Sequence, residues 1–172
     1  MRTVVAICVL WAGLLLEATL FQIPPFNLIH PNFVLDTIVL LALTRGGRVA
    51  VLLGVAAGFV QDIDYGSFIG LYAFSYGLIG YFSAAAFAQF MHRNVAITFL
   101  VSVVFTFIYV WLTYGLTRMF DVTGADIHSV LLLSLTEMIV NGLVLLLLYP
   151  WLTKWLTPRR NRQYGESDAD TA

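Results

Sequence analysis

The sequence predicts an all-α membrane protein with six transmembrane helices and with both termini in the cytoplasm. Of its 172 residues, 60% are hydrophobic and 11% are charged, which is far from the balance of soluble proteins. The positive charges are also unevenly placed. Eight of the nine Lys and Arg residues lie before, after or between the apolar runs at every second gap; they are Arg2, Arg45, Arg48, Arg93, Lys154, Arg159, Arg160 and Arg162. Only Arg118 lies at one of the other gaps. Cytoplasmic loops retain Lys and Arg whereas short translocated loops lack them, so this alternation predicts the orientation.

The apolar runs predict helices over residues 3–23, 32–45, 48–62, 67–90, 95–118 and 128–156. The first run has no small-residue cleavage site after it and spans about 30 Å, so it is expected to be a retained helix and not a signal peptide. Pro24-Pro25 ends this helix, since proline lacks an amide donor, and Pro31 stands at the start of the second.

The second and third helices are short, at roughly 21 Å against a hydrocarbon core of about 30 Å. A re-entrant hairpin is the alternative for this pair. That alternative would leave Arg45 and Arg48 within the membrane or at the wrong surface, so two crossings are preferred. The segment Arg45-Gly46-Gly47-Arg48 then forms a tight cytoplasmic turn, and bilayer thinning or burial against longer neighbours accommodates the short helices.

We expect residues 1–157 to form one six-helix transmembrane domain and residues 158–172 to form a cytoplasmic tail. The tail is first basic and then acidic, a composition typical of disorder. The external loops are expected at 24–31, 62–66 and 119–127. No basic surface extends beyond short loops and the tail, which argues against nucleic acid as a partner.

Small residues follow one face of the third helix and of the fourth helix. The first set is Ala50, Gly54 and Gly58, ending in Asp62, and the second is Gly66, Gly70, Ala73, Gly77, Gly80, Ala84 and Ala88. Residues three or four apart share a helical face, and in a bilayer close backbone approach supplies the association energy. The sequence therefore predicts a tightly packed antiparallel hairpin, with a groove for the helix of another protein as the alternative.

Three acids and one amide within the predicted spans are candidate functional residues: Glu17, Asp36, Glu137 and Asn141. A charged group is costly in the bilayer, so such residues usually face the protein interior or water. Glu17 and Asp36 flank the same external turn and are expected within reach of each other. Interhelical hydrogen bonding is the preferred role, and a proton or cation relay is the alternative.

Asp62 differs from these acids because it is predicted at the membrane face. It precedes the fourth helix, where a carboxylate can accept from free backbone amides around Ser67–Ile69. A helix cap is the preferred role, and contact with a partner protein is the alternative.

The sequence offers little support for an enzyme, a metal site or a cofactor. His30, His92 and His128 lie on at least two sides of the membrane and show no metal-ligand spacing. A nucleophile elbow and a phosphate-binding loop are both missing from the sequence. We expect a protein that is not an enzyme and that binds no cofactor.

The segment from Gly54 to Tyr81 resembles the central motif of the MreD family of rod shape-determining membrane proteins. That motif is a glycine-rich helix, an Asp, then Gly-x-x-x-Gly-x-x-Ala and Gly-Tyr. Its elements correspond in order to Gly54, Gly58, Asp62, Gly66, Gly70, Ala73, Gly80 and Tyr81. Pro31, Arg45 and Arg48 also resemble the family, in which an acid or amide commonly follows the proline; this sequence has Asn32 there.

The resemblance implies a non-enzymatic component of the elongation complex that guides lateral peptidoglycan synthesis in the bacterial inner membrane. It further implies direct binding of an MreC-like protein, with RodA, the elongation penicillin-binding protein and MreB in the same complex.

The family is also similar in fold to the six-helix substrate-binding subunits of energy-coupling-factor vitamin transporters, which gives the alternative function. Such a subunit is expected to have a ligand cavity near the external face and an Ala-x-x-x-Ala stripe on the first helix. Here that stripe reads Ala6, Leu10, Leu14, Ala18, and the two leucines count against the transporter. A third possibility, an ion channel around Glu17, Asp36 and Glu137, would require a polar helix face that the sequence does not clearly show.

Overall fold

The computed structural model describes residues 2–20, 31–89 and 94–156, and the regular elements in this part of the chain are all α-helices. They are α1 (Arg2–Leu20), α2 (Phe33–Arg45), α3 (Gly47–Tyr65), α4 (Leu71–Gln89), α5 (Val95–Met119) and α6 (Ile127–Leu156). The all-α prediction is confirmed, and each helix corresponds to one predicted apolar run. The predicted tail at 158–172, residues 24–30 of the first external loop and residues 91–93 of a cytoplasmic loop lie outside the described residues.

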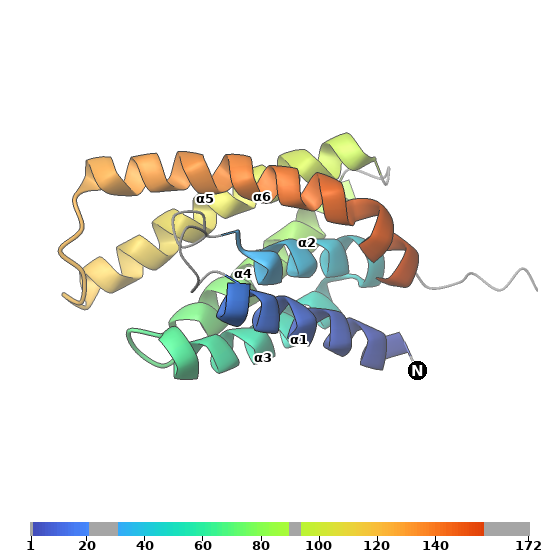
Figure 1. Cartoon of the computed structure of the whole chain (residues 1–172), viewed down its shortest axis with the longest axis horizontal. Helices are drawn as coiled ribbons and strands as arrows, with labels where there is room; N and C mark the ends of the chain where they lie inside the picture. Colours follow the sequence, from blue (N-terminus) through green and yellow to red (C-terminus); the bar gives the residue numbers. More distant parts are fainter. Residues whose placement is uncertain (1, 21–30, 90–93, 157–172) are drawn as a thin grey trace, which may run out of the picture.

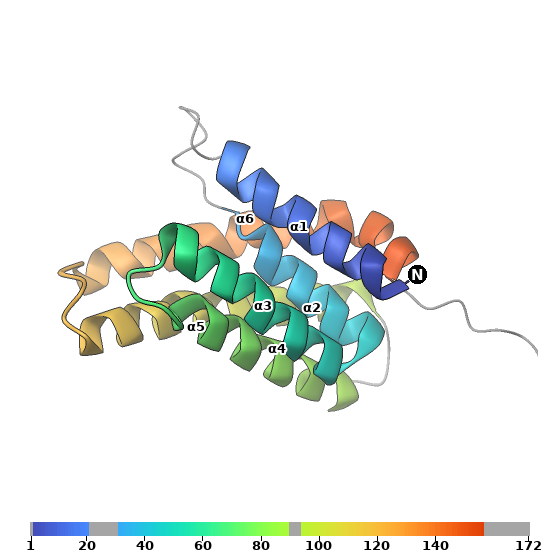
Figure 2. The ribbon, with the colours of Figure 1, turned by 90° about the horizontal axis from the view of Figure 1, so that it is seen from below.

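The helices form a bundle in which α2 lies between two groups of helices. In Figure 1, α5 and α6 run along one side and α1 and α3 along the other. Figure 2 shows α2, α3 and α4 side by side, with α1 running alongside α2. The start of α1 and the end of α6 lie at the same end of the bundle, and the α5–α6 hairpin extends beyond the other helices at the opposite end (Figure 1). We call that opposite end the outer end.

The helix α2 is the central element of the core. All of its residues from Val34 to Ala42 are buried, and those from Val34 to Leu41 are at most 3% exposed. A helix that is hydrophobic all round is a buried one. Its 13 residues give about 20 Å, which is less than the bilayer core. Because longer helices enclose it, α2 does not have to match the thickness of the lipid.

A glycine pair joins α2 to α3 with almost no intervening loop. Gly46 has φ 86°, and its amide donates to the carbonyl of Ala42 at 3.2 Å. Glycine adopts this left-handed conformation without steric penalty, so one residue ends α2 and the next begins α3.

The α3–α4 turn corrects two predicted boundaries. The helix α3 continues to Tyr65, so Asp62 lies inside it and is only 4% exposed; it does not lie in an external loop. No helix-breaking residue precedes Gly66, whose amide still donates to the carbonyl of Asp62 at 3.1 Å. In turn, α4 begins at Leu71 and not at Ser67, because Gly70 has φ 105° and interrupts the helix.

The α3–α4 interface brings two backbones into direct contact. A Cβ atom on Gly58 would lie 2.4 Å from Ala73 Cα, and one on Gly54 would lie 2.9 Å from the carbonyl oxygen of Tyr76. Further along the helices, a Cβ on Gly80 would lie 3.0 Å from the backbone of Ala50. The small-residue faces therefore pack against each other along the hairpin.

Three of the described helices are long and apolar enough to cross a membrane. They are α4, α5 and the segment Ile127–Lys154 of α6, and the apolar stretch of α1, Val4–Thr19, is shorter. The prediction of six crossings therefore goes beyond what helix length and composition show.

Candidate functional site

A chain of hydrogen bonds connects side chains from five helices and from the residue that caps the sixth. We call it the interhelical polar network, and its members are Glu17, Asn32, Gln61, Tyr76, Thr106 and Asn141. These residues come from α1, the start of α2, α3, α4, α5 and α6 in that order. Each step in the network joins a different pair of elements, so the network ties the described bundle together through polar groups.

Tyr76 is at the centre of this network and is fully buried. Its hydroxyl donates to Gln61 Oε1 at 2.7 Å and accepts from Asn32 Nδ2 at 3.0 Å. The Tyr109 hydroxyl lies 3.5 Å away, and the two rings stack with centroids 5.4 Å apart. A buried hydroxyl with these partners fixes α3, α4, α5 and the start of α2 relative to one another.

Asn32 connects the network to α2. Its Oδ1 accepts from the Leu35 amide at 2.7 Å, which is the geometry of an N-cap. The backbone amide of Asn32 donates to Asn141 Oδ1 at 2.8 Å, and Asn141 Nδ2 donates to Thr106 Oγ1 at 3.2 Å. Asn141 is itself completely buried, so its amide is used for bonds between helices.

Glu17 reaches the same helix start from α1. Its Oε1 accepts from the Val34 amide at 2.9 Å, and its Oε2 accepts from Gln61 Nε2. The first amides of a helix lack partners within the helix and carry partial positive charge, so a carboxylate is favourable there. Glu17 therefore helps to cap α2 from outside that helix.

Asp36 lies one turn further along α2 and binds a different partner. Its Oδ1 accepts from Ser102 Oγ at 2.7 Å, while its Oδ2 has no partner among the described residues. Both acids are therefore near the start of α2, but their hydrogen bonds go to different groups: Glu17 binds the Val34 amide and Gln61, and Asp36 binds Ser102. Glu137 is half-buried on α6, one turn before Asn141.

The helix α5 carries a polar face that sequence analysis missed. Thr98, Ser102, Thr106 and Tyr109 follow one another at intervals of four and three, and all are buried. The statement that no helix shows a clear polar face is therefore wrong. Two of these hydroxyls bind Asp36 and Asn141 inside the bundle, so the face joins helices to each other.

Asp62 accepts three backbone hydrogen bonds at the start of α4. Its carboxylate receives the amides of Gly70 at 2.9 Å, Tyr72 at 2.8 Å and Ala73 at 3.2 Å. These amides lie a few residues beyond Ser67–Ile69, where the sequence predicted them, because α4 begins later than expected. The α3 carboxylate thus caps the next helix across the turn.

The predicted small residues divide between two structural roles. Gly54, Gly58, Ala73 and Gly80 lie in the α3–α4 interface, and Gly77 lies against the Val55 side chain. Gly66 packs on the backbone of Asp62, whereas Gly70 faces open space and supplies the turn. Packing between the protein's own helices therefore occupies the small-residue faces at Gly54, Gly58 and Gly80.

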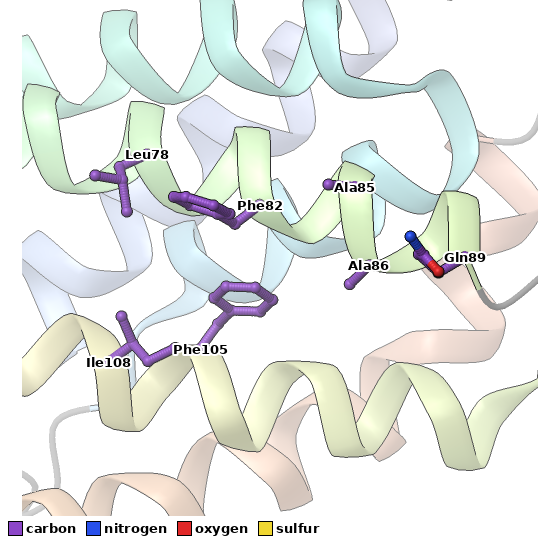
Figure 3. Close-up of a pocket in the computed structure, with 7 residues that line it drawn as sticks. All are labelled: Leu78, Phe82, Ala85, Ala86, Gln89, Phe105 and Ile108. Atoms are coloured by element: carbon purple, nitrogen blue, oxygen red, sulfur yellow. The ribbon is translucent and has the colours of Figure 1, made fainter.

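An apolar groove of about 490 Å³ lies between α4 and α5. Figure 3 shows Phe82 and Phe105 in the space between the two helices, with Gln89 at one end. Among the described residues that line it (Leu78, Phe82, Ala85, Ala86, Gln89, Phe105 and Ile108), Gln89 alone is polar. Small-molecule sites combine apolar walls with several convergent polar groups, which this groove lacks.

No group of His, Cys, Asp and Glu that could hold a metal ion occurs within residues 2–20, 31–89 and 94–156. The Ala6, Leu10 and Leu14 positions of the first-helix stripe are buried in the core. That face of α1 is therefore occupied within the protein.

Comparison with known proteins decides the family. The family model described as rod shape-determining protein MreD matches residues 1–158. The chain belongs to the MreD family. The resemblance seen in the glycine-rich segment is thereby confirmed, and membership of the MreD family assigns the chain a role in rod-shape determination as a membrane protein. No curated protein and no solved structure matches the chain.

Proposed function

We propose that the protein is a non-enzymatic component of the bacterial elongation complex. In this proposal it binds an MreC-like protein directly and helps to position or regulate lateral peptidoglycan synthesis. RodA, the elongation penicillin-binding protein and MreB belong to the same complex. The observation that carries the proposal is the MreD family match over residues 1–158.

The use of the buried polar groups supports a scaffold. Tyr76, Asn141 and Asp62 form hydrogen bonds with groups on other helices, and close contact at the small-residue faces joins α3 to α4. An arrangement of this kind fixes the shape of a bundle. It presents a constant surface to a partner in place of a pocket with free reactive groups.

The proposed topology is six crossings of the inner membrane with both termini in the cytoplasm. An even number of crossings requires the two chain ends on one side, and the start of α1 and the end of α6 lie at the same end of the bundle (Figure 1). Arg45 and Arg48 belong to the α2–α3 turn, and Lys154 lies in the last turn of α6, as the positive-inside rule favours.

Co-purification tests the proposed function. The full chain is solubilised in mild detergent from cells that contain its MreC-like partner, and the purified material is examined for that partner and for a bound vitamin. We expect a stable complex with the partner. Retention of a vitamin without a protein partner would overturn the proposal in favour of a transporter subunit.

Variants in the same experiment test whether the complex depends on the folded bundle. Tyr76→Phe removes the central hydroxyl of the interhelical polar network and is expected to lower the yield of complex. Tyr81→Phe is the matched control, because Tyr81 lies on the same helix and is 62% exposed. It is expected to leave the yield unchanged.

A further inference from the structure

Large apolar side chains are exposed at the outer end of the bundle. Ile69 is 75% exposed in the α3–α4 turn, and Met119 and Phe120 are 82% and 64% exposed at the end of α5. The rings of Phe68 and Phe120 lie 4.8 Å apart, which joins the turn to the α5–α6 loop. We call this surface the outer-end patch; it consists of Phe68, Ile69, Met119, Phe120 and Val122.

Backbone hydrogen bonds hold the α5 part of this patch in a fixed conformation. The amide of Asp121 donates to the carbonyl of Arg118 at 3.2 Å, and the amide of Val122 donates to the carbonyl of Thr117 at 2.9 Å. This pair of bonds is the Schellman pattern, in which the residue after the helix adopts a left-handed conformation. Asp121 occupies that position with φ 56°. The apolar side chains on both sides of it are therefore presented by an ordered backbone.

The same two segments carry acidic side chains around the patch. Asp64, Asp121 and Asp126 are exposed, and Arg118 is the one basic residue in 62–70 and 118–126. An acidic surface attracts a basic partner and repels anionic lipid head groups. The charges therefore favour a polypeptide over a membrane surface as the occupant of the patch.

The lengths of α5 and α6 place their connecting loop outside the hydrocarbon layer. Their 25 and 30 residues correspond to about 37 Å and 45 Å, against a core of about 30 Å. The α5–α6 hairpin extends past the other helices in both views (Figures 1 and 2). With the termini in the cytoplasm, this end faces the exterior of the membrane.

We infer that the outer-end patch is a docking surface for an external segment of the MreC-like partner. That segment of the partner contains apolar side chains that alternate with Lys and Arg or are flanked by them. This inference rests on the proposed function and adds to it the surface and the chemistry of the partner. The apolar residues supply the contact area, and the three aspartates orient the basic segment over it.

The affinity of the purified full-length chain for the purified full-length MreC-like protein tests this surface in nonionic detergent. Met119→Ser and Ile69→Ser are each expected to weaken binding by about five-fold or more, as central apolar contacts do. Asp121→Asn is expected to weaken it by about three-fold and to reduce its dependence on salt. Asparagine tolerates the left-handed backbone, so this variant changes the charge and keeps the turn.

Two control variants and a folding check accompany these measurements. Arg118→Gln removes the one opposing charge and is expected to leave the affinity unchanged or to raise it. Ala88→Ser lies on an exposed part of α4 away from the patch and is expected to have no effect. The thermal midpoints of all variants should match that of the wild type, because the side chains that are changed are exposed.

The result distinguishes failure of the surface from failure of the function. If the wild type binds and the Met119, Ile69 and Asp121 variants all stay within about two-fold of it, the docking surface is wrong while the proposed function stands. If Arg118→Gln weakens binding as much as Asp121→Asn, a basic partner segment is excluded. If the wild type does not bind the partner at all, the proposed function is overturned and the docking surface with it.

Discussion

Asp62 is the residue whose role the structure defines most fully. It accepts hydrogen bonds from three backbone amides at the start of α4 and is almost completely buried. Asp62→Ala would leave these amides without an acceptor, so we expect a loss of about 2–3 kcal/mol in the free energy of unfolding. The measurement is the thermal midpoint of the detergent-solubilised protein.

Neighbouring substitutions make this prediction specific. Asp64→Ala removes an exposed carboxylate two residues away and should change stability by less than about 0.5 kcal/mol. Asp62→Asn keeps one acceptor oxygen and should fall between the wild type and the alanine variant. Equal midpoints for Asp62→Ala and Asp64→Ala would show that the cap does not stabilise the fold.

Tyr76 gives a second prediction at the scale of single residues. Tyr76→Phe keeps the ring stacked against Tyr109 but removes the hydroxyl that joins Gln61 to Asn32. Leaving buried amide groups without partners costs about 1–3 kcal/mol, so the thermal midpoint should fall. Tyr81→Phe on the exposed face should not lower it, and a fall of the same size in both variants would contradict the assignment.

At the scale of elements, the α3–α4 hairpin depends on the missing side chain of Gly58. Gly58→Ala would place a Cβ atom 2.4 Å from Ala73 Cα, so the two helices would have to separate. Overpacking of this kind costs about 1–3 kcal/mol, and the loss is read as a lower thermal midpoint.

Gly115→Ala is the matched control for this substitution. Gly115 lies inside α5, and a Cβ atom there would meet no described atom within 4 Å. Alanine should therefore be neutral or should raise stability by about 0.5–1 kcal/mol, through helix propensity alone. Destabilisation of similar size in both variants would mean that close backbone contact is not the reason for Gly58.

The order of the helices was predictable from the sequence, whereas several of their ends were not. Apolar runs separated by polar and glycine-containing gaps indicate where helices lie. The small-residue spacing treated Gly70 as a helical position, but its left-handed backbone places it in the turn. Spacing describes which residues share a helical face; it contains no information on the φ angle of a glycine.

The central position of α2 was also beyond prediction. By length alone, its 13 residues suit both a short crossing and a re-entrant segment. What makes it central is contact with helices far along the chain, such as Asp36 with Ser102. Such pairings depend on how the whole bundle packs, and one sequence does not specify them.

At the scale of the whole molecule, the proposed topology is testable by cysteine labelling. In a Cys8→Ser background, a membrane-impermeant maleimide should label Ser67→Cys in intact spheroplasts. It should label Arg48→Cys and Ser167→Cys only after permeabilisation. The reason is that α3 separates positions 48 and 67, and α4, α5 and α6 separate positions 67 and 167.

Each alternative topology gives a distinct labelling pattern. Labelling of positions 48 and 67 from the same side would show that α3 does not cross, as in a re-entrant hairpin. Labelling of position 167 but not of position 67 in intact spheroplasts would show that the orientation is the reverse of the proposed one. Denatured protein is labelled in parallel as a control. It shows that each introduced cysteine reacts with the maleimide when it is accessible.

Among the polar groups inside the bundle, the sequence identified the acids and one amide, and it missed the hydroxyl groups. Glu17, Asp36 and Asn141 stand out because ionisable and amide groups are costly inside a membrane. Tyr76, Ser102 and Thr106 do not stand out, since hydroxyl groups are common in transmembrane helices and often bond to their own backbone. On α5, the spacing of four and three residues between Thr98, Ser102, Thr106 and Tyr109 was a usable signal.

The enclosed position of α2 has a consequence for how the protein is made. During synthesis α2 emerges before the helices that hold its polar groups: the partner of Asp36 lies on α5, and the partner of the Asn32 amide lies on α6. Until α6 has been inserted, these groups are without their final partners inside the membrane. Completion of the fold therefore waits for the last helix. A chain shortened before Asn141 should be recognised by membrane quality-control proteases, even though its first five helices are complete.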